Sequence, residues 1–217
     1  MQYRQLYREI SIVVVAKISP EQCNPLFLQK KQVISEAEVM KVRGGMRVSS
    51  DMASFKIEDG FEVYCDKERV QVRTEDVTLS DRLCDFLTSL IVILDIKVNA
   101  IGINGIFRFG LIDVDLLRFS HRCCPNNAFG PLVDNAMLLD MTIADWNHTE
   151  NGVTPQTVYN ISRQPNDVNG LSVVQIAVNN HLQIKQNKGL AAQYLRQSSN
   201  LHTAFFEKCH EFIRSVR

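Results

Sequence analysis

The sequence predicts an α+β fold of two similar lobes, each a mainly antiparallel sheet of about three or four strands packed by one amphipathic helix. Segments with period-two alternation of apolar and polar residues occur in groups, and each group precedes a segment with a wide apolar stripe at helical spacing. This order occurs twice within the 217 residues. We therefore expect an N-terminal lobe at 1–112, a connection at 113–134 and a C-terminal lobe at 135–217, with the lobes packed as one unit.

The N-terminal lobe is expected to begin with a buried strand at Ile10–Ile18, a stretch rich in β-branched residues. Residues 53–76 predict a three-stranded antiparallel meander, because their apolar residues alternate and Asp59–Gly60 is a strong hairpin signal. The apolar stripe in residues 77–96 predicts an amphipathic helix that lies on this sheet. A further strand is expected at 97–111, where glycines indicate a bulge or a close backbone approach.

The C-terminal lobe repeats this order. Strands are expected at Asn135–Asn147, at 156–165 and at Leu171–Lys185, separated by turn-forming residues. A terminal helix is expected at Asn200–Val216, with one apolar face. No residue-level identity between the halves indicates a duplication.

The composition limits the classes of partner. Lysine plus arginine (24) equal aspartate plus glutamate (24), so net charge does not indicate nucleic acid or an anionic membrane, although a local basic patch stays open. The apolar run at Ile10–Ile18 is too short to span a bilayer, and no cleavage-site pattern follows it. The six cysteines have irregular spacing, which is typical of reduced core cysteines. We expect a cytoplasmic protein.

Two segments carry a partial resemblance to a known group of proteins. Residues 9–34 and 83–109 resemble an uncharacterised prokaryotic protein family with two similar α+β lobes, over roughly half the chain. The terminal helix is similar to the closing helix of a broader group of sporadically distributed prokaryotic proteins. The resemblance implies a fold and a prokaryotic or phage-related source, and no activity. A leucine between Pro25 and Phe27 departs from the family pattern. The matching residues are Asn24, Pro25, Phe27, Leu28, Ala100, Gly102, Ile103 and Asn104.

The stretch "FSHRCCPNNAFG" at 119–130 has the residue types of a metal site. His121, Cys123 and Cys124 are too close together to give three ligands to one tetrahedral zinc, because ligand pairs normally stand two to four residues apart. A disulfide between the adjacent cysteines would be strained and unsuited to a reducing compartment. We interpret the stretch as a connection between the lobes. We expect no metal and no cofactor.

Other residues with possible chemistry have simpler explanations. Cys65, Cys84 and Cys209 fall on apolar faces, so we expect them to be buried structural residues. His202 and His210 are expected along one polar face of the last helix, as a partner-facing stripe or as ordinary solvated surface.

Two function hypotheses follow. The first is a non-enzymatic interaction or scaffold subunit of a homo- or hetero-oligomeric prokaryotic complex, in a defence or stress-response setting, because open strand edges are natural sites of protein association. The second is a small-molecule or nucleotide sensor, or an unrecognised hydrolase, with a pocket between the lobes. Its expected lining is Asn104, Arg108, His121 and Trp146.

Overall fold

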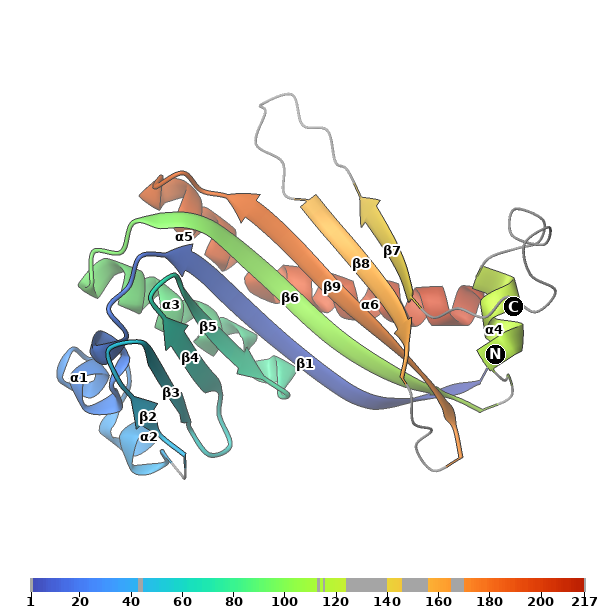
Figure 1. Ribbon diagram of the computed structural model, residues 1–217, viewed down its shortest axis with the longest axis horizontal. Helices are drawn as coiled ribbons and strands as arrows, with labels where there is room; N and C mark the ends of the chain where they lie inside the picture. Colours follow the sequence, from blue (N-terminus) through green and yellow to red (C-terminus); the bar gives the residue numbers. More distant parts are fainter. Residues whose placement is uncertain are drawn as a thin grey trace.

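A computed structural model describes residues 2–42, 45–112, 114, 116–123, 140–145, 156–164 and 170–216. In these residues, nine strands form one antiparallel sheet in the order β2-β3-β4-β5-β1-β6-β9-β8-β7 (Figure 1). The strands are β1 (Tyr3–Ala16), β2 (Arg47–Val48), β3 (Met52–Lys56), β4 (Glu62–Asp66), β5 (Arg69–Thr74), β6 (Val98–Leu111), β7 (Asp140–Asp145), β8 (Gln156–Arg163) and β9 (Ser172–Gln183).

The same residues form six α-helices and two short 3-10 turns. The helices are α1 (Pro25–Lys30), α2 (Glu36–Met40), α3 (Ser80–Ile93), α4 (Leu116–Cys123), α5 (Lys188–Arg196) and α6 (Ser198–Ser215), and the turns are η1 (Pro20–Cys23) and η2 (Val77–Leu79). Within this part of the chain, no helix is both long and apolar enough to pass through a bilayer.

The prediction of two separate lobes is wrong, because the halves share one continuous sheet. The long strands β1 and β6 pair antiparallel from Tyr3↔Leu111 to Ala16↔Val98, and β6 pairs in turn with β9. The predicted order of three strands followed by helix does occur twice, in β3–β5 with α3 and in β7–β9 with α5 and α6; a long strand, β1 or β6, also precedes each group. Period-two alternation predicts strands but not their partners, so the sequence did not show that the two long strands pair with each other.

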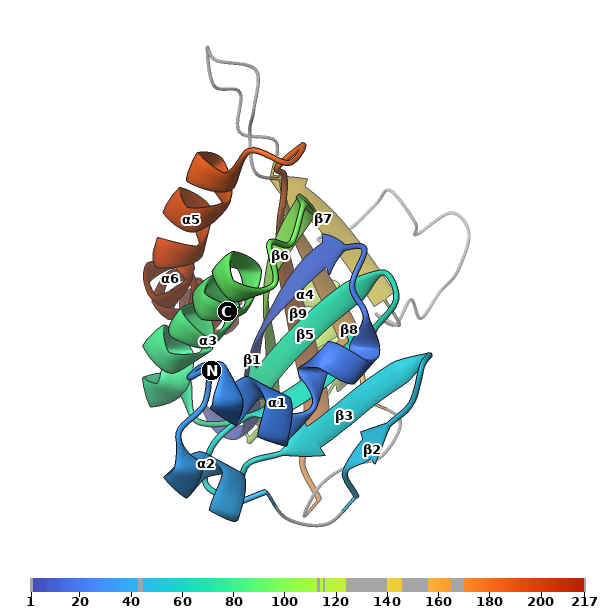
Figure 2. The same ribbon diagram turned by 90° about the vertical axis from the view of Figure 1, so that its left-hand side faces the viewer.

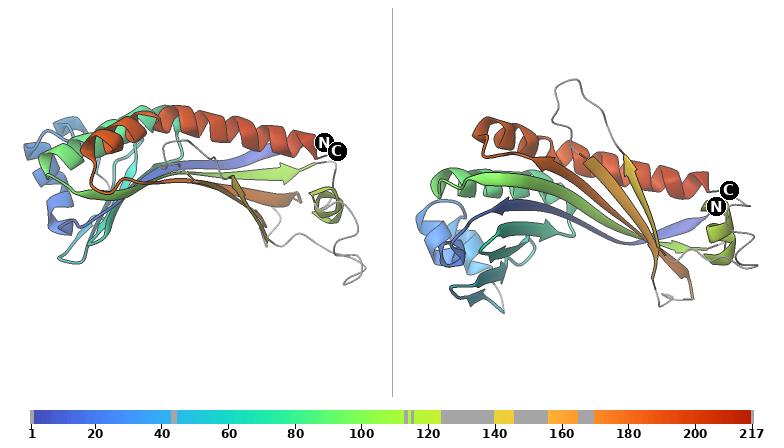
Figure 3. Two further views of the ribbon diagram at one scale, coloured as in Figure 1. Left: turned by 90° about the horizontal axis from the view of Figure 1, so that it is seen from above. Right: turned by 45° about the horizontal axis from the view of Figure 1, so that its top comes forward.

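Helices α3, α5 and α6 lie together on one side of the sheet, which is bowed so that the other side is concave (Figures 2 and 3). Helices α3 and α6 contact β1, and α5 and α6 contact β6. Buried residues from strands and helices fill the space between these layers. They include Ile10, Ile12, Val72, Ile103, Phe107, Phe109 and Ile176 from the sheet, and Leu83, Phe86, Leu90, Phe205 and Ile213 from the helices.

Two contacts fix the helices on this layer. Arg82 of α3 donates hydrogen bonds to both carboxylate oxygens of Glu38 in α2, from Nε at 2.9 Å and from Nη2 at 3.0 Å. Tyr194 of α5 donates to the backbone oxygen of Asn180 in β9 at 3.0 Å. Because the residues in both contacts are partly or fully buried, their directional hydrogen bonds fix the orientation of each helix and also add stability.

Most of the predicted strands are present, and the buried residues of β3, β4 and β5 alternate as predicted, whereas β2 was not predicted. Strand β1 begins at Tyr3, earlier than the predicted Ile10, because residues 3–9 lack the β-branched run on which the prediction was based. The predicted hairpin joins β3 to β4, and Asp59 has the positive φ (55°) that its tight turn requires. Sequence reasoning missed α4 and α5. The predicted connection at 113–134 and the predicted strand at Asn135–Asn147 lie largely outside the described residues.

Gly105 shows why a glycine is needed within β6. A Cβ at this position would lie 2.7 Å from Cε2 of Phe107, whose ring is fully buried and packs on Phe206 at 6.0 Å between centroids. At Gly102 of the same strand, the nearest atom to an added Cβ is 3.7 Å away, an ordinary contact. The ring of Phe107 therefore occupies the space over Gly105.

We predict that Gly105→Ala lowers the free energy of unfolding by about 1–3 kcal/mol, because the buried ring must leave its rotamer. The matched variant Gly102→Ala should change stability by less than about 0.5 kcal/mol. Urea denaturation of both variants measures this. Equal stability of the two variants would contradict the packing described for Phe107.

Candidate functional site

The side of the sheet that faces away from α3, α5 and α6 is the candidate site, and we call it the open face. Pleating brings alternate residues of each strand to this face. The register places Lys56, Glu62, Arg73 and Ser11 in one row across β3, β4, β5 and β1. Farther across the sheet, Asn104 of β6 is opposite Ser11 and Asn179 of β9 is opposite Asn104. This row is therefore polar from β3 to β9.

Side chains on the open face form a connected chain of contacts that we call the charge ladder. Lys56 Nζ lies 3.3 Å from Glu62 Oε1, and Arg73 Nη2 lies 2.6 Å from Glu62 Oε2. Arg73 Nη1 is also 3.5 Å from Glu9 Oε2. The ladder therefore joins four neighbouring strands, with cations and anions in alternation.

The ladder continues through Tyr7 into the second half of the sheet. Tyr7 donates a hydrogen bond to Glu9 Oε2 at 2.9 Å, and the Arg108 guanidinium lies 4.8 Å from the centre of the Tyr7 ring. Arg108 Nε donates to Gln175 Oε1 at 2.8 Å. The complete ladder is Lys56, Glu62, Arg73, Glu9, Tyr7, Arg108 and Gln175, and it spans β3, β4, β5, β1, β6 and β9.

The ladder favours the ionised form of Glu62. Burial alone would raise the pKa of Glu62, but hydrogen bonds and charge from Arg73 and Lys56 lower it below its ordinary value. Hydrogen bonding to Glu62 raises the pKa of Arg73, and burial together with Glu9 raises that of Tyr7. The Arg73 side chain is 48% exposed, and exposed pairs contribute only about 0–1 kcal/mol each. The ladder therefore positions charges more than it stabilises the fold.

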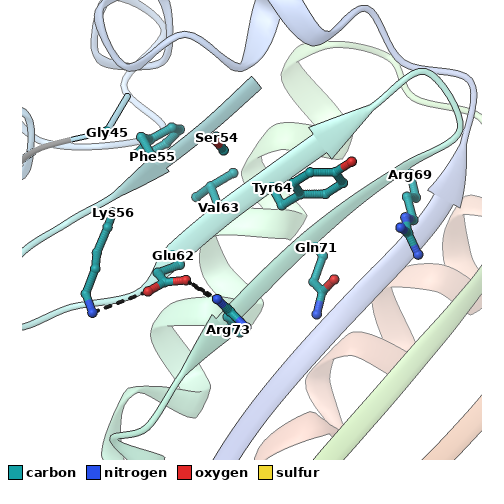
Figure 4. A pocket seen from close by; sticks show the side chains of 10 residues that line it. All are labelled: Gly45, Ser54, Phe55, Lys56, Glu62, Val63, Tyr64, Arg69, Gln71 and Arg73. Atoms are coloured by element: carbon teal, nitrogen blue, oxygen red, sulfur yellow. Dashed lines mark hydrogen bonds and ion pairs between the residues drawn. The ribbon is translucent and has the colours of Figure 1, made fainter. Parts of the chain in front are cut away.

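Two hollows lie on either side of the ladder row on β3–β5. The first, which we call the cationic hollow, has a volume of about 540 Å³ (Figure 4). Its lining includes Tyr64, Gln71 and three cations, of which Arg69 lies 5.7 Å from the Tyr64 ring centre. Glu62 is the single acid among the described residues of its lining, and Arg69 is also paired with Asp66, whose Oδ2 lies 3.1 Å from Arg69 Nε. The three cations are Lys56, Arg69 and Arg73.

The second hollow lies toward the turn between β3 and β4 and has a volume of about 600 Å³; we call it the acidic hollow. It shares the ladder row with the cationic hollow. Its acids outnumber its cations, since Lys56 and Arg73 are the two cations in its lining. The six acids in its lining are Glu9, Glu58, Asp59, Glu62, Glu75 and Asp76.

Two of the four predicted ligand residues share the open face. Asn104 and Arg108 both lie on β6, four residues apart and so roughly 13 Å apart along the strand. Asn104 Oδ1 is buried without a hydrogen-bond partner among the described residues. His121 is exposed on α4, beyond the end of the long strands (Figure 1). Trp146 lies outside the described residues. The structure therefore brings Asn104 and Arg108 to one face, while His121 lies away from it.

The histidine- and cysteine-containing stretch at 119–130 is described only as far as Cys123. Residues 119–123 lie in α4, where Phe119 is fully buried and packs on Phe212 of α6 at 6.4 Å between ring centroids. Cys124 and the residues after it lie outside the described part. Among the described residues, no three histidine, cysteine or acidic side chains converge in a way that could hold a metal ion.

The prediction of a polar histidine face on the last helix is wrong. His202 is 3% exposed, and its Nδ1 lies 2.7 Å from Ser80 Oγ at the start of α3. His210 packs against β1, with Nδ1 2.6 Å from Tyr3 Oη. Both side chains turn toward the sheet because the face of α6 that packs on β1 and β6 is wider than its apolar stripe alone.

Ser80 and His202 have the residue types of a nucleophile and a base, but the pair is closed to a substrate. Ser80 is 2% exposed, and burial lowers the pKa of His202 to about 4, while the backbones of Ser11 and Asn104 favour its charged form more weakly. His202 Nε2 has no hydrogen-bond partner in the described part of the chain. The imidazole is therefore neutral at pH 7 and joins α3 to α6. The predicted burial of Cys65, Cys84 and Cys209 is confirmed.

Sequence reasoning missed the charge ladder. Glu62 and Arg73 are polar residues of correctly predicted strands, but period-two alternation indicates only that such residues face away from the core. Glu9 lies one residue before the predicted start of the first strand at Ile10. The order of the strands, which the sequence did not show, brings them together. Comparison with known proteins adds no assignment, since no family model and no curated protein matches the chain.

We predict that His202 makes the protein less stable in weak acid. The pKa is about 4 in the folded state and about 6.5 in the unfolded chain, so the unfolded state binds more protons between these values. The contribution of His202 to the free energy of unfolding is complete above about pH 6.5. It falls by about 3 kcal/mol as the pH decreases to 4. His210, whose pKa is lowered by burial and by Arg214, adds to the loss with the same sign.

Urea denaturation between pH 7 and pH 4.5 measures this dependence. His202→Gln should flatten the slope of unfolding free energy against pH in that window, whatever its stability at pH 7. His181→Gln, on the open face, is the matched control and should keep the wild-type slope. An unchanged slope in His202→Gln would contradict the buried, neutral state of the imidazole.

Proposed function

We propose that this chain is a non-enzymatic interaction subunit that binds a protein partner on the open face of its sheet. The observation that carries the proposal is the charge ladder: seven side chains of alternating character held in place across six neighbouring strands on a face that no described helix covers. Side chains that are already ordered lose less conformational entropy when a partner binds. Contact surfaces of this kind gain specificity from matched charges.

The mixed charge of the open face favours a protein over a nucleic acid. A nucleic-acid site presents one sign of charge to the phosphates, whereas the ladder alternates Lys56, Glu62, Arg73 and Glu9. The Ser80–His202 pair has the residue types of an active site, but both side chains are buried, so a substrate cannot reach them. The expected place in a prokaryotic defence or stress-response complex stays a prediction, which the identity of the bound partner would test.

Co-expression with the products of the neighbouring genes tests the proposal. Asn179 is exposed on the open face of β9, so Asn179→Arg would insert a long cation there without removing a core contact. We predict that this variant weakens the complex at least ten-fold while its melting temperature stays within about 2 °C of wild type. Glu207→Arg, on the exposed side of α6, is the control and should bind normally. Equal binding by both variants, or substrate turnover by the chain alone, would count against the proposal.

A second candidate function rests on the cationic hollow. Three cations, one acid and the ring of Tyr64 would suit a small anionic ligand with a flat ring, such as a nucleotide. This candidate corresponds to the small-molecule or nucleotide sensor hypothesis, but its ligand site would lie on β3–β5 and not at Asn104 and Arg108.

A thermal-shift panel of nucleotides and inorganic phosphate tests the second candidate. At ten times its dissociation constant, a ligand of this class should raise the melting temperature by about 3 °C. Arg69→Ala should abolish the shift, while Glu75→Gln, in the acidic hollow, should keep it. No shift across the panel would remove this candidate and leave the first.

A further inference from the structure

The two edges of the sheet are built differently. Strand β2 at one edge has only two residues, Arg47–Val48, whereas β7 at the other edge has six, Asp140–Asp145. Very short edge strands, lysines, prolines and bulges are the usual features that stop a sheet edge from pairing with another chain. Strand β7 contains no lysine or proline, and its register with β8 has no shift. The β7 edge therefore lacks the protection that the β2 edge has.

The side of the sheet on which α3, α5 and α6 lie, which we call the helix side, is incompletely covered at β7. Residues directly opposite each other on paired strands share a side of the sheet. Met141 of β7 is opposite Ile161, and Ile161 is opposite Ile176, both of them buried in the core. In the neighbouring row on the same side, Ile143 is opposite the partly buried Tyr159, but Ile143 itself is 45% exposed. The apolar layer of the core therefore extends to the outermost strand and ends there at Ile143.

The outer edge of β7 also has backbone groups for pairing. A residue in an antiparallel strand directs its N–H and C=O groups to one side, and the next residue directs them to the other side. Strand β8 pairs with one side of β7, and no strand in the described part of the chain pairs with the other side (Figure 1). Alternate residues of β7 therefore present both donors and acceptors at the outer edge.

We propose that β7 pairs antiparallel with β7 of a second copy of this chain, about a two-fold axis that passes through the sheet at Thr142. The inference goes beyond the proposed function, because the edge of the sheet is a different surface from the open face. In this register Thr142 is opposite its own counterpart, and Met141 of each copy is opposite Ile143 of the other. The same apolar pair therefore forms twice. Asp140 is opposite Ala144, so this carboxylate does not face another acid.

The side chains of β7 favour a second copy in this register. The axis keeps the helix sides of both copies on one side of the joined sheet, so each residue must be opposite a residue from the same side of its strand. An axis at Ile143 would instead place Met141 opposite Asp145, an apolar side chain against a carboxylate. With the axis at Thr142, each copy supplies the methionine that covers the exposed isoleucine of the other. Because each copy contributes one short strand, the interface is small and the dimer is weak.

A charge on the helix side of β7 tests the dimer. Ile143→Lys should weaken self-association at least ten-fold in analytical ultracentrifugation, because it places a cation against Met141 at both equivalent contacts. Val92→Lys is the matched control, since Val92 is also an exposed apolar residue, 73% exposed on α3. This variant should dimerise like wild type.

An equimolar mixture of Ile143→Glu and Met141→Lys tests the register as well. Each variant alone should associate at least ten-fold more weakly than wild type, because each places a charge against an apolar side chain at both contacts. In the mixed dimer, the new glutamate is opposite the new lysine at one contact, and the original methionine–isoleucine pair is kept at the other. We therefore expect a one-to-one dimer that is tighter than the dimer of either variant. This rescue cannot come from a change in folding, because neither chain is altered by mixing.

Three results would overturn the dimer: a wild-type chain that is monomeric at about 200 µM, self-association that Ile143→Lys leaves unchanged, or a mixture that associates no better than its separate variants. The proposed function is tested separately, because Asn179→Arg changes the open face and should leave self-association as in wild type. Ile143→Lys should in turn bind a partner on the open face normally. A monomeric chain that loses its partner in Asn179→Arg would keep the proposed function and reject only the dimer.

Discussion

The pairing of β1 with β6 is the constraint on which the rest of the structure depends. These two 14-residue strands begin the two halves of the chain, and their register from Tyr3↔Leu111 to Ala16↔Val98 turns two meanders into one sheet. The pairing also gathers the helices on one layer, since α6 contacts both strands. One side of the sheet is thereby buried, and the other side, which no described helix covers, becomes a single wide face.

The two sides of these strands have different roles because pleating separates them. On the helix side, apolar residues and a closed Ser80–His202 bond hold the layers together. On the open face, charged residues that contribute little to stability are nevertheless ordered by one another. Glu9 shows the effect, because its side chain is only 12% exposed and its carboxylate accepts a hydrogen bond from Tyr7 and pairs with Arg73. These side chains are ordered although they add little to the stability of the fold, which indicates a binding role for the open face.

Local patterns predicted most strands, the hairpin at Asp59–Gly60 and the two long amphipathic helices, because these depend on residues close in sequence. They did not predict which strands pair, since alternation in β1 is equally compatible with a separate lobe. Of the predicted ligand residues that the structure describes, Asn104 and Arg108 share a face, whereas His121 belongs to α4. The charge ladder joins residues more than a hundred positions apart, from Glu9 to Gln175, and only the strand order brings them together.

Both halves of the chain fold as one sheet through β1 and β6. Native-state amide hydrogen exchange tests it most directly, because it reports the free energy of opening for each strand. We predict that β1, β6 and β9 are the most protected strands and open together, with the same free energy as global unfolding. Two groups of strands, one from each half, that exchange with separate opening free energies would show two independent lobes and contradict it.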